Sequence, residues 1–121
     1  MYVMKKLKIA FDVDDTLIVP RVATKGDYEV PNYENIAIYK FFQGQGHHMI
    51  VWSGSGKDWA ETWSEKLGLF PDECFSKADS LRPRDVDIAF DDCDVELAKV
   101  NVKVKRVENS VSRADWNNDK Q

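Results

Sequence analysis

The chain has 121 residues and a formal net charge of −4 at pH 7, a length that supports one hydrophobic core but not a second lobe. Hydrophobic residues make up 43% of the chain and charged residues 31%, as is ordinary for a soluble globular protein. The acidic balance gives no general electrostatic footprint for nucleic acid, and no apolar run approaches the length of a membrane span. We therefore expect a single domain over residues 1–108 and a polar tail over residues 109–121.

Cysteine usage and the N-terminal residues both favour a cytoplasmic protein. Cys74 and Cys93 are the two cysteines, too few for a disulfide framework or a structural zinc site, so we interpret them as free thiols in a reducing compartment. The lysines near the N-terminus precede only three apolar residues, 9–11, before Asp12, which is too short for the apolar core of a signal peptide. No membrane partner is expected.

The first predicted strand ends in crowded negative charge. Residues 8–11 predict a buried strand, which is followed by Asp12, Asp14, Asp15 and Thr16. Such crowding is costly unless a cation lies among the carboxylates. Mg²⁺ is the best candidate because it prefers one or two carboxylates together with waters and substrate phosphate oxygens. The alternative is structural, with Asp14 and Asp15 serving as turn or helix-capping residues.

The next segments predict a flap, a helix and a strand. Residues 18–31 contain two prolines and one glycine, which indicates an excursion such as a small β-hairpin flap. Asn32 can cap a helix that extends to about Gln43. A second strand over about residues 48–52 then leads into Ser53, for which the structural alternative is a capping hydroxyl.

A second helix should follow this strand. Asp58 with Glu61 three residues later fits a capping box, and Gly68 fits the C′ position that ends a helix. Three apolar side chains at helical spacing favour core packing, with stacking against a nucleobase as the alternative: Trp59, Trp63 and Leu67.

The last third of the chain predicts three strands and one short helix. Strands are expected over residues 74–76, 86–90 and 101–107, and a helix over residues 95–99. Alternation of strands and helices predicts an α/β fold with a parallel sheet of about five strands. A basic run is expected on the solvated face of the outer strand, where lysine blocks aggregation: Lys99, Lys103, Lys105 and Arg106.

Three of these strands end in polar side chains. Asp12 follows the first strand, Ser53 the second, and Asp91 with Asp92 the strand over residues 86–90. Open α/β sheets bind ligands outside the carboxyl ends of their strands, near the point where strand order reverses. The three strand ends therefore predict one composite site.

These strand ends resemble the motifs of the haloacid dehalogenase superfamily of phosphatases. Residues 12–16, Asp-Val-Asp-Asp-Thr, resemble the DxDx(T/V) first motif. Residues 49–53 are similar to the second motif, an apolar strand ending in Ser or Thr, and residues 88–92 to the fourth motif in its paired-acid form. The resemblance covers about residues 7–107. It implies a single Rossmann-like domain flanked by helices, Mg²⁺ as cofactor and phosphomonoester hydrolysis.

The resemblance also implies roles for individual residues. Asp12 would attack phosphorus, form an aspartyl-phosphate and bind Mg²⁺. Asp14 would act as general acid and base and offer its backbone carbonyl to the metal. Thr16 would steady the turn beside the phosphate, and Ser53 with the amide of Gly54 would hold a phosphoryl oxygen.

Two assignments stay open within this resemblance. Asp92 is expected to bind the metal directly with Asp91 behind it, and the reverse is the alternative. The third motif requires a lysine shortly before the strand over residues 86–90, to neutralise the phosphoryl group and Asp12. Lys77 has the best position, and Arg82, which precedes a proline, is the rival.

The substrate cannot be read from these motifs, but the missing cap domain constrains it. Residues 17–31 have room only for a flap, and capless members of the superfamily accept bulky substrates or borrow a neighbouring subunit as a lid. We expect a phosphorylated substrate such as a nucleotide, a polynucleotide end or another bulky phosphate, with Trp52 or Trp59 along the rim. A homo-oligomer is an open alternative, and nucleic acid has no support from the net charge.

Two other functions compete with phosphatase activity. A non-catalytic member of the same fold would act as a binding module. A receiver-type signalling domain is also doubly wound, binds Mg²⁺ and is phosphorylated on aspartate, but its phosphoacceptor ends a middle strand, where this chain has Ser53.

Overall fold

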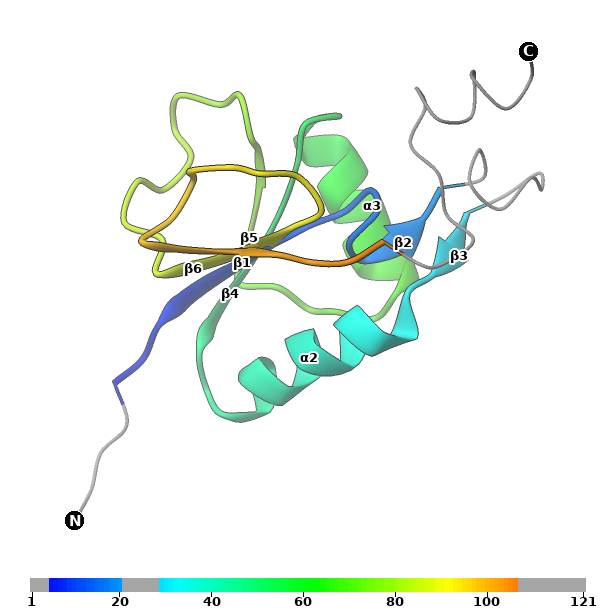
Figure 1. The fold of residues 1–121 in the computed structure, drawn as a ribbon, viewed down its shortest axis with the longest axis horizontal. Helices are drawn as coiled ribbons and strands as arrows, with labels where there is room; N and C mark the ends of the chain where they lie inside the picture. Colours follow the sequence, from blue (N-terminus) through cyan, green and yellow to red (C-terminus); the bar gives the residue numbers. More distant parts are fainter. Residues whose placement is uncertain (1–4, 21–28, 107–121) are drawn as a thin grey trace.

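A parallel sheet of five strands forms the centre of the structure, a computed structural model that describes residues 5–20 and 29–106. The strands lie in the order β5-β4-β1-β6-β7, and every neighbouring pair is parallel. This arrangement confirms the predicted α/β class (Figure 1). The bounds are Lys8–Asp12 for β1, His48–Ser53 for β4, Glu73–Ser76 for β5, Ile88–Asp91 for β6 and Val100–Lys103 for β7.

The order of the strands creates a switch point beside β1. The chain passes outward from β1 to β4 and β5, then returns to the other side of β1 for β6 and β7. Numbered along the chain, the sheet has the order 3-2-1-4-5, which is that of the Rossmann fold. The crevice outside the carboxyl ends of β1 and β6 is where such sheets bind ligands.

Two helices pack on the same face of the sheet. Tyr39 of α2 (Tyr33–Gly44) and Trp63 of α3 (Lys57–Lys66) both enter the core cluster that contains Phe11 of β1. The predicted cap of α2 is confirmed, because the side chain of Asn32 accepts the N–H of Asn35. The Trp59, Trp63 and Leu67 stripe also packs against this core, in agreement with the expected core packing.

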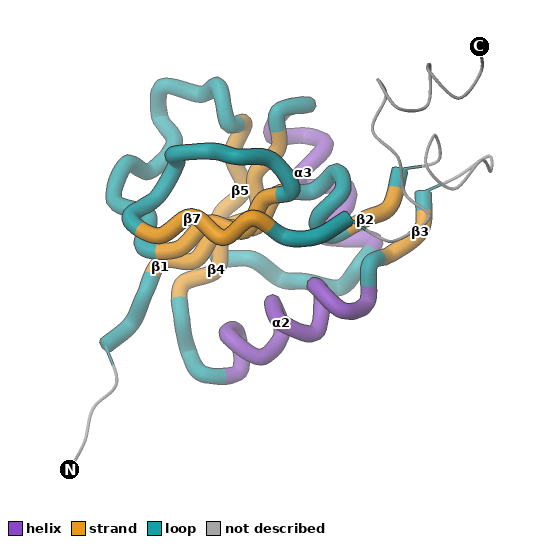
Figure 2. The backbone as a smooth tube through the Cα atoms, in the orientation of Figure 1, coloured by secondary structure: helices purple, strands orange, loops and turns teal. Residues whose placement is uncertain are grey.

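Loops cover the opposite face in the described residues. Ala10, Ile50 and Trp52 form a second cluster there, together with Val86 from one loop and the half-buried Leu97 from another. Figure 2 shows these loops on the side of the sheet away from α2.

The helix expected over residues 95–99 is absent, so that prediction was wrong. The side-chain oxygen of Asn101 accepts the N–H groups of Leu97 and Ala98, and its amide nitrogen donates to the carbonyl of Ala98. Such side-chain bonds offer the backbone an alternative to helix. A stretch of five residues is also too short to offset the cost of helix nucleation.

The capping box at the start of α3 was also wrong, whereas the helix end was predicted correctly. Gly56 is the N-cap residue, with φ of 111° and no side-chain cap, and Asp58 lies inside the first turn. A carboxylate at that position still stabilises the helix, because it lies near the positive end of the helix dipole. Gly68 follows the C-cap residue with φ of 63°, the left-handed conformation that glycine adopts without strain.

The remaining expectations concern the flap and the C-terminal segment. β2 (Ile18–Val19) and β3 (Val30–Pro31) pair antiparallel, as a hairpin base would. Residues 21–28 between them, residue 107 of the predicted outer strand and the tail over 109–121 lie outside the described residues. β7 ends at Lys103, earlier than expected. In the part of the chain that the structure describes, no helix has the length and apolar character needed to cross a membrane.

Candidate functional site

Asp12 lies at the centre of the candidate site. It is the last residue of β1 and is 5% exposed. Since side chains alternate along a strand, Asp12 shares the loop-covered face with Ala10 rather than the helix-covered face with Phe11. Its Oδ2 accepts the hydroxyl of Thr16 at 3.3 Å.

Lys77 joins this carboxylate to a second one. It follows β5 directly, and its backbone N–H donates to the carbonyl of Ser53 at 3.0 Å. Its ammonium lies 2.7 Å from Oδ1 of Asp12 and 2.5 Å from Oδ2 of Asp91. One lysine therefore bridges the carboxyl ends of β1 and β6.

Arg82, the alternative to Lys77 in the third motif, contacts Trp52. The guanidinium of Arg82 is 5.9 Å from the ring centroid of Trp52, a cation–π arrangement. Trp52 itself is fully buried in the loop-covered face. The expectation that Trp52 lines the rim was therefore wrong, while Trp59 is half-buried.

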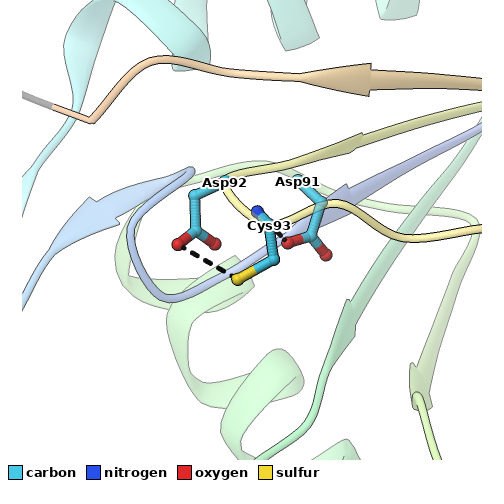
Figure 3. A group of neighbouring side chains, drawn as sticks. All are labelled: Asp91, Asp92 and Cys93. Carbon is cyan, nitrogen blue, oxygen red and sulfur yellow. Dashed lines mark hydrogen bonds between the residues drawn. The ribbon is translucent and has the colours of Figure 1, made fainter. Parts of the chain in front are cut away.

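The acidic pair after β6 is fixed by bonds of different kinds (Figure 3). Asp91 accepts the backbone N–H of Cys93 through Oδ1, in addition to Lys77 through Oδ2. Oδ2 of Asp92 accepts from Nε and Nη2 of Arg106, at 3.0 and 2.8 Å, and from the thiol of Cys93 at 3.6 Å. Ligand atoms of Asp91, Asp92 and Cys93 all lie within 4.8 Å of one another.

Arg106 is the functional candidate that the sequence analysis missed. It was assigned to the solvated face of the outer strand, whereas its guanidinium pairs with the buried Asp92. Two lysines of the same basic run pair with other carboxylates and not with Asp12, Asp91 or Asp92: Lys99 pairs with Asp87, and Lys103 with Asp94. The available signal was its place just past the carboxyl end of β7, at the same edge of the sheet as the other site residues.

Asp14 has contact partners different from those of Asp12. Its Oδ1 accepts the indole N–H of Trp59 at 3.3 Å, and its Oδ2 accepts the hydroxyl of Ser55 at 3.5 Å. Asp15 next to it has φ of 64°, a left-handed conformation that aspartate tolerates better than most residues. The turn thus directs Asp12 toward Lys77 and Asp14 toward α3.

The turn is held in place by α2 and by its own backbone. The carbonyl of Val13 accepts the N–H groups of Thr16 and of the two residues after it. The side chain of Asn35 donates to the carbonyl of Thr16 at 2.8 Å in a buried position. The first motif is therefore a turn held by hydrogen bonds to its own backbone and to α2.

Ser53 and Gly54 form the turn at the end of β4. The Ser53 side chain is fully buried, and its Oγ accepts the N–H of Ser55 at 2.9 Å. This contact belongs to a turn and is not the helix cap considered as the structural alternative, because Gly56 is the N-cap residue of α3 and no side chain caps that helix. Gly54 is exposed, and a Cβ atom there would meet nothing within 4 Å. Contact of either residue with a phosphoryl oxygen stays a prediction.

Burial and neighbouring charges shift the pKa values of the site residues. Burial raises the pKa of Asp12 from 3.8 to about 8, the charge of Lys77 opposes this shift, and the charges of Asp91 and Asp92 add to it. Burial lowers the pKa of Lys77, but Asp12 and Asp91 outweigh that effect and raise it. Burial raises the pKa of Asp92, but its bonds to Arg106 and to the other two carboxyl groups lower it below its ordinary value.

The carboxylate cluster suits a divalent cation. The charges of Asp91 and Asp92 both raise the pKa of Asp12, so the three carboxyl groups lie near one another at the carboxyl ends of β1 and β6. Mg²⁺ is usually bound through one or two carboxylates together with waters and phosphate oxygens. Asp12, Asp91 and Asp92 offer the oxygen ligands that Mg²⁺ prefers, while the ligand atoms that lie within 4.8 Å of one another are those of Asp91, Asp92 and Cys93.

No protein-family model, curated protein or solved structure matches this chain.

Proposed function

We propose that this chain is a Mg²⁺-dependent phosphomonoester hydrolase of the haloacid dehalogenase type, with Asp12 as nucleophile. The observation that carries the proposal is the position of the Lys77 ammonium, 2.7 Å from Asp12 and 2.5 Å from Asp91. These groups lie outside the carboxyl ends of β1 and β6, at the switch point of the parallel sheet. A carboxylate, a lysine and an acidic pair at that place suit an aspartyl-phosphate mechanism.

The first step requires a nucleophile and a cation that neutralises the negative charge of the nucleophile and the phosphoryl group. Asp12 attacks phosphorus and forms an aspartyl-phosphate, while Lys77 neutralises charge on both the carboxylate and the phosphoryl group. Ser53 and the amide of Gly54 hold a phosphoryl oxygen at the end of β4. Thr16 orients Asp12 through the bond to its Oδ2.

Asp14 moves the protons in both steps. It donates a proton to the leaving oxygen as the bond from that oxygen to phosphorus breaks. It then takes a proton from the water that attacks the aspartyl-phosphate, which releases phosphate and restores the Asp12 carboxylate. General acid–base catalysis of this kind typically contributes ~10²–10⁴-fold.

Asp12 and Asp92 would hold Mg²⁺ directly, with Asp91 behind them. Asp91 uses one oxygen for Lys77 and the other for the amide of Cys93, whereas the Arg106 and Cys93 bonds of Asp92 go to the same oxygen, Oδ2. Mg²⁺ bound there would offset carboxylate charge and polarise the phosphoryl group.

A cavity beside the acidic pair offers room for the rest of the substrate. It measures about 370 Å³, within the range of small-ligand pockets. Asn101 and Lys103 reach it from β7, on the same loop-covered face as Asp12, because Val102 between them packs into the opposite core. Cys93, whose thiol contacts Oδ2 of Asp92, also lines it.

The competing functions receive less support. Receiver domains have the strand order 2-1-3-4-5 of the flavodoxin-like fold, whereas this sheet has the order 3-2-1-4-5. A binding module would need no nucleophile, so loss of Asp12 distinguishes it from an enzyme.

Turnover of p-nitrophenyl phosphate with and without Mg²⁺ tests the proposal. We expect Mg²⁺-dependent activity in the wild type and its loss in Asp12→Asn, because an amide is a poor nucleophile and a weaker ligand. Asp85→Asn, which changes an exposed carboxylate paired with Lys8 at the opposite edge of the sheet, is the matched control. Activity of Asp12→Asn within tenfold of wild type, a barrier change under ~1.4 kcal/mol, would contradict the proposal.

A further inference from the structure

The side chain of Asp14 is held from the segment that begins α3. Trp59 in the first turns of α3 donates its indole N–H to Oδ1 at 3.3 Å, and Ser55 in the loop before it donates its hydroxyl to Oδ2 at 3.5 Å. These contacts join residues more than 40 positions apart in the chain. The general acid of the proposed reaction is thus tied to the helix-covered side of the sheet.

The two donors differ in what they allow. An indole N–H only donates, so the oxygen that it contacts must act as an acceptor. A hydroxyl both donates and accepts, so it can accommodate a proton on its neighbour. Trp59 therefore requires Oδ1 to act as an acceptor, whereas the Ser55 hydroxyl is compatible with a proton on Oδ2.

We propose that Trp59 is a positioning residue that orients Asp14 so that Oδ2 delivers the proton to the leaving oxygen. This inference depends on the proposed phosphatase function and extends it to a residue outside the motifs. Contacts of 3.3 and 3.5 Å are long for hydrogen bonds, and catalytic hydrogen bonds often tighten only in the complex with substrate.

The ring of Trp59 is placed well for this role. It packs edge-on against Trp63, with ring centroids 6.0 Å apart and planes at 71°, and lies against the helix-covered core. It is half-buried, so its N–H reaches the site while its ring is fixed by packing. An indole held in this way loses little further freedom when it orients Asp14.

The chain contains a matched control one turn further along α3. The indole nitrogen of Trp63 is buried without a hydrogen-bond partner among the described residues. Trp59→Phe and Trp63→Phe therefore remove the same group from neighbouring positions on one helix. Only the first of these substitutions removes a contact with Asp14.

The leaving-group dependence of turnover tests the role. Aryl phosphates have good leaving groups and need little protonation, whereas alkyl phosphates need a general acid. We expect Trp59→Phe to slow an alkyl phosphate by ~10-fold or more, within the range of general acid catalysis, and p-nitrophenyl phosphate by less than threefold. Trp63→Phe should slow both substrates equally, and Trp59→His, which keeps a ring N–H, should recover part of the alkyl activity.

A double-mutant cycle shows whether Trp59 acts through Asp14. In the Asp14→Asn background, Trp59→Phe should have no further selective effect, because the group it orients has lost its proton. Equal losses on both substrate classes in Trp59→Phe, or a selective loss that persists in Asp14→Asn, would overturn the inference. A wild type without any phosphatase activity would instead overturn the proposed function and this role with it.

The contact itself can be measured without activity. The chain has four tryptophans, so an ¹⁵N-labelled sample gives few indole N–H signals to assign by substitution. The signal of Trp59 should move in Asp14→Asn while that of Trp63 stays in place. A Trp59 signal that is indifferent to Asp14→Asn would show that the hydrogen bond is absent, and would reject the role even in an active enzyme.

Discussion

The ammonium of Lys77 lies 2.7 Å from Oδ1 of Asp12, across the intervening strand β4. Both side chains are largely buried, and the same ammonium reaches Asp91 in β6. Lys77 is therefore part of the stability of the metal-free site as well as of the proposed chemistry.

Replacing Lys77 with methionine should destabilise the metal-free protein. The substitution leaves the buried Asp91 without its cation and removes a hydrogen-bond donor from Asp12, which is protonated at pH 7; breaking a buried pair costs about 3 kcal/mol. The free energy of unfolding at pH 7, from urea titration, measures this loss. Lys103→Met is the control: Lys103 and Asp94 form an exposed pair, worth less than ~1 kcal/mol. Equal losses in the two variants would contradict the structural role of Lys77.

The Asp12 carboxyl should make the metal-free protein less stable as pH rises. Its pKa is about 8 in the folded chain against an ordinary value of 3.8, so between these values the folded chain keeps a proton that the unfolded chain loses. Unfolding then releases a proton, and stability falls across that window. Asp12→Asn has no such proton, so its stability relative to wild type should increase from pH 4 to pH 8. A pH-independent difference between the two proteins in EDTA would refute this.

Arg106 should stabilise the fold through Asp92. Its bonds lower the pKa of Asp92 below 3.8, so their contribution is complete above that value and is lost as pH falls through the lowered pKa. We expect Arg106→Gln to cost about 1 kcal/mol at pH 7 and progressively less below pH 4. Lys105→Gln changes the neighbouring exposed residue and should cost nothing measurable in the same thermal or urea melts.

Mg²⁺ should stabilise the folded protein in proportion to its occupancy. A ligand at one hundred times its Kd adds about 2.7 kcal/mol of stability, visible as a rise in Tm with Mg²⁺ concentration. Asp92→Asn should abolish this rise, whereas the exposed Asp94→Asn should retain it. Because ligation displaces the Asp12 proton, affinity should increase from pH 6 to pH 8. If the Tm of the wild type does not change with Mg²⁺ concentration, the proposal that Mg²⁺ binds at this site is wrong.

The local elements of this protein were predictable because their causes are local. Burial of successive residues in β1 and β4, the Asn32 cap and the Gly68 terminus each depend on a few neighbouring residues. Two local predictions were wrong, the capping box at Asp58 and the helix over residues 95–99. In the structure Gly56 begins α3 in place of Asp58, and the side chain of Asn101 bonds the backbone of the second segment.

The sequence by itself determined that three parallel strands end in polar groups, because the pattern of a strand and the residues of the turn after it depend on adjacent positions. Only the tertiary structure decided which side chains meet: Lys77 rather than Arg82 at Asp12, Arg106 at Asp92 and Trp59 at Asp14. Strand order and the paths of loops set these contacts, which join residues 14 to 65 positions apart, and no local pattern encodes such distances.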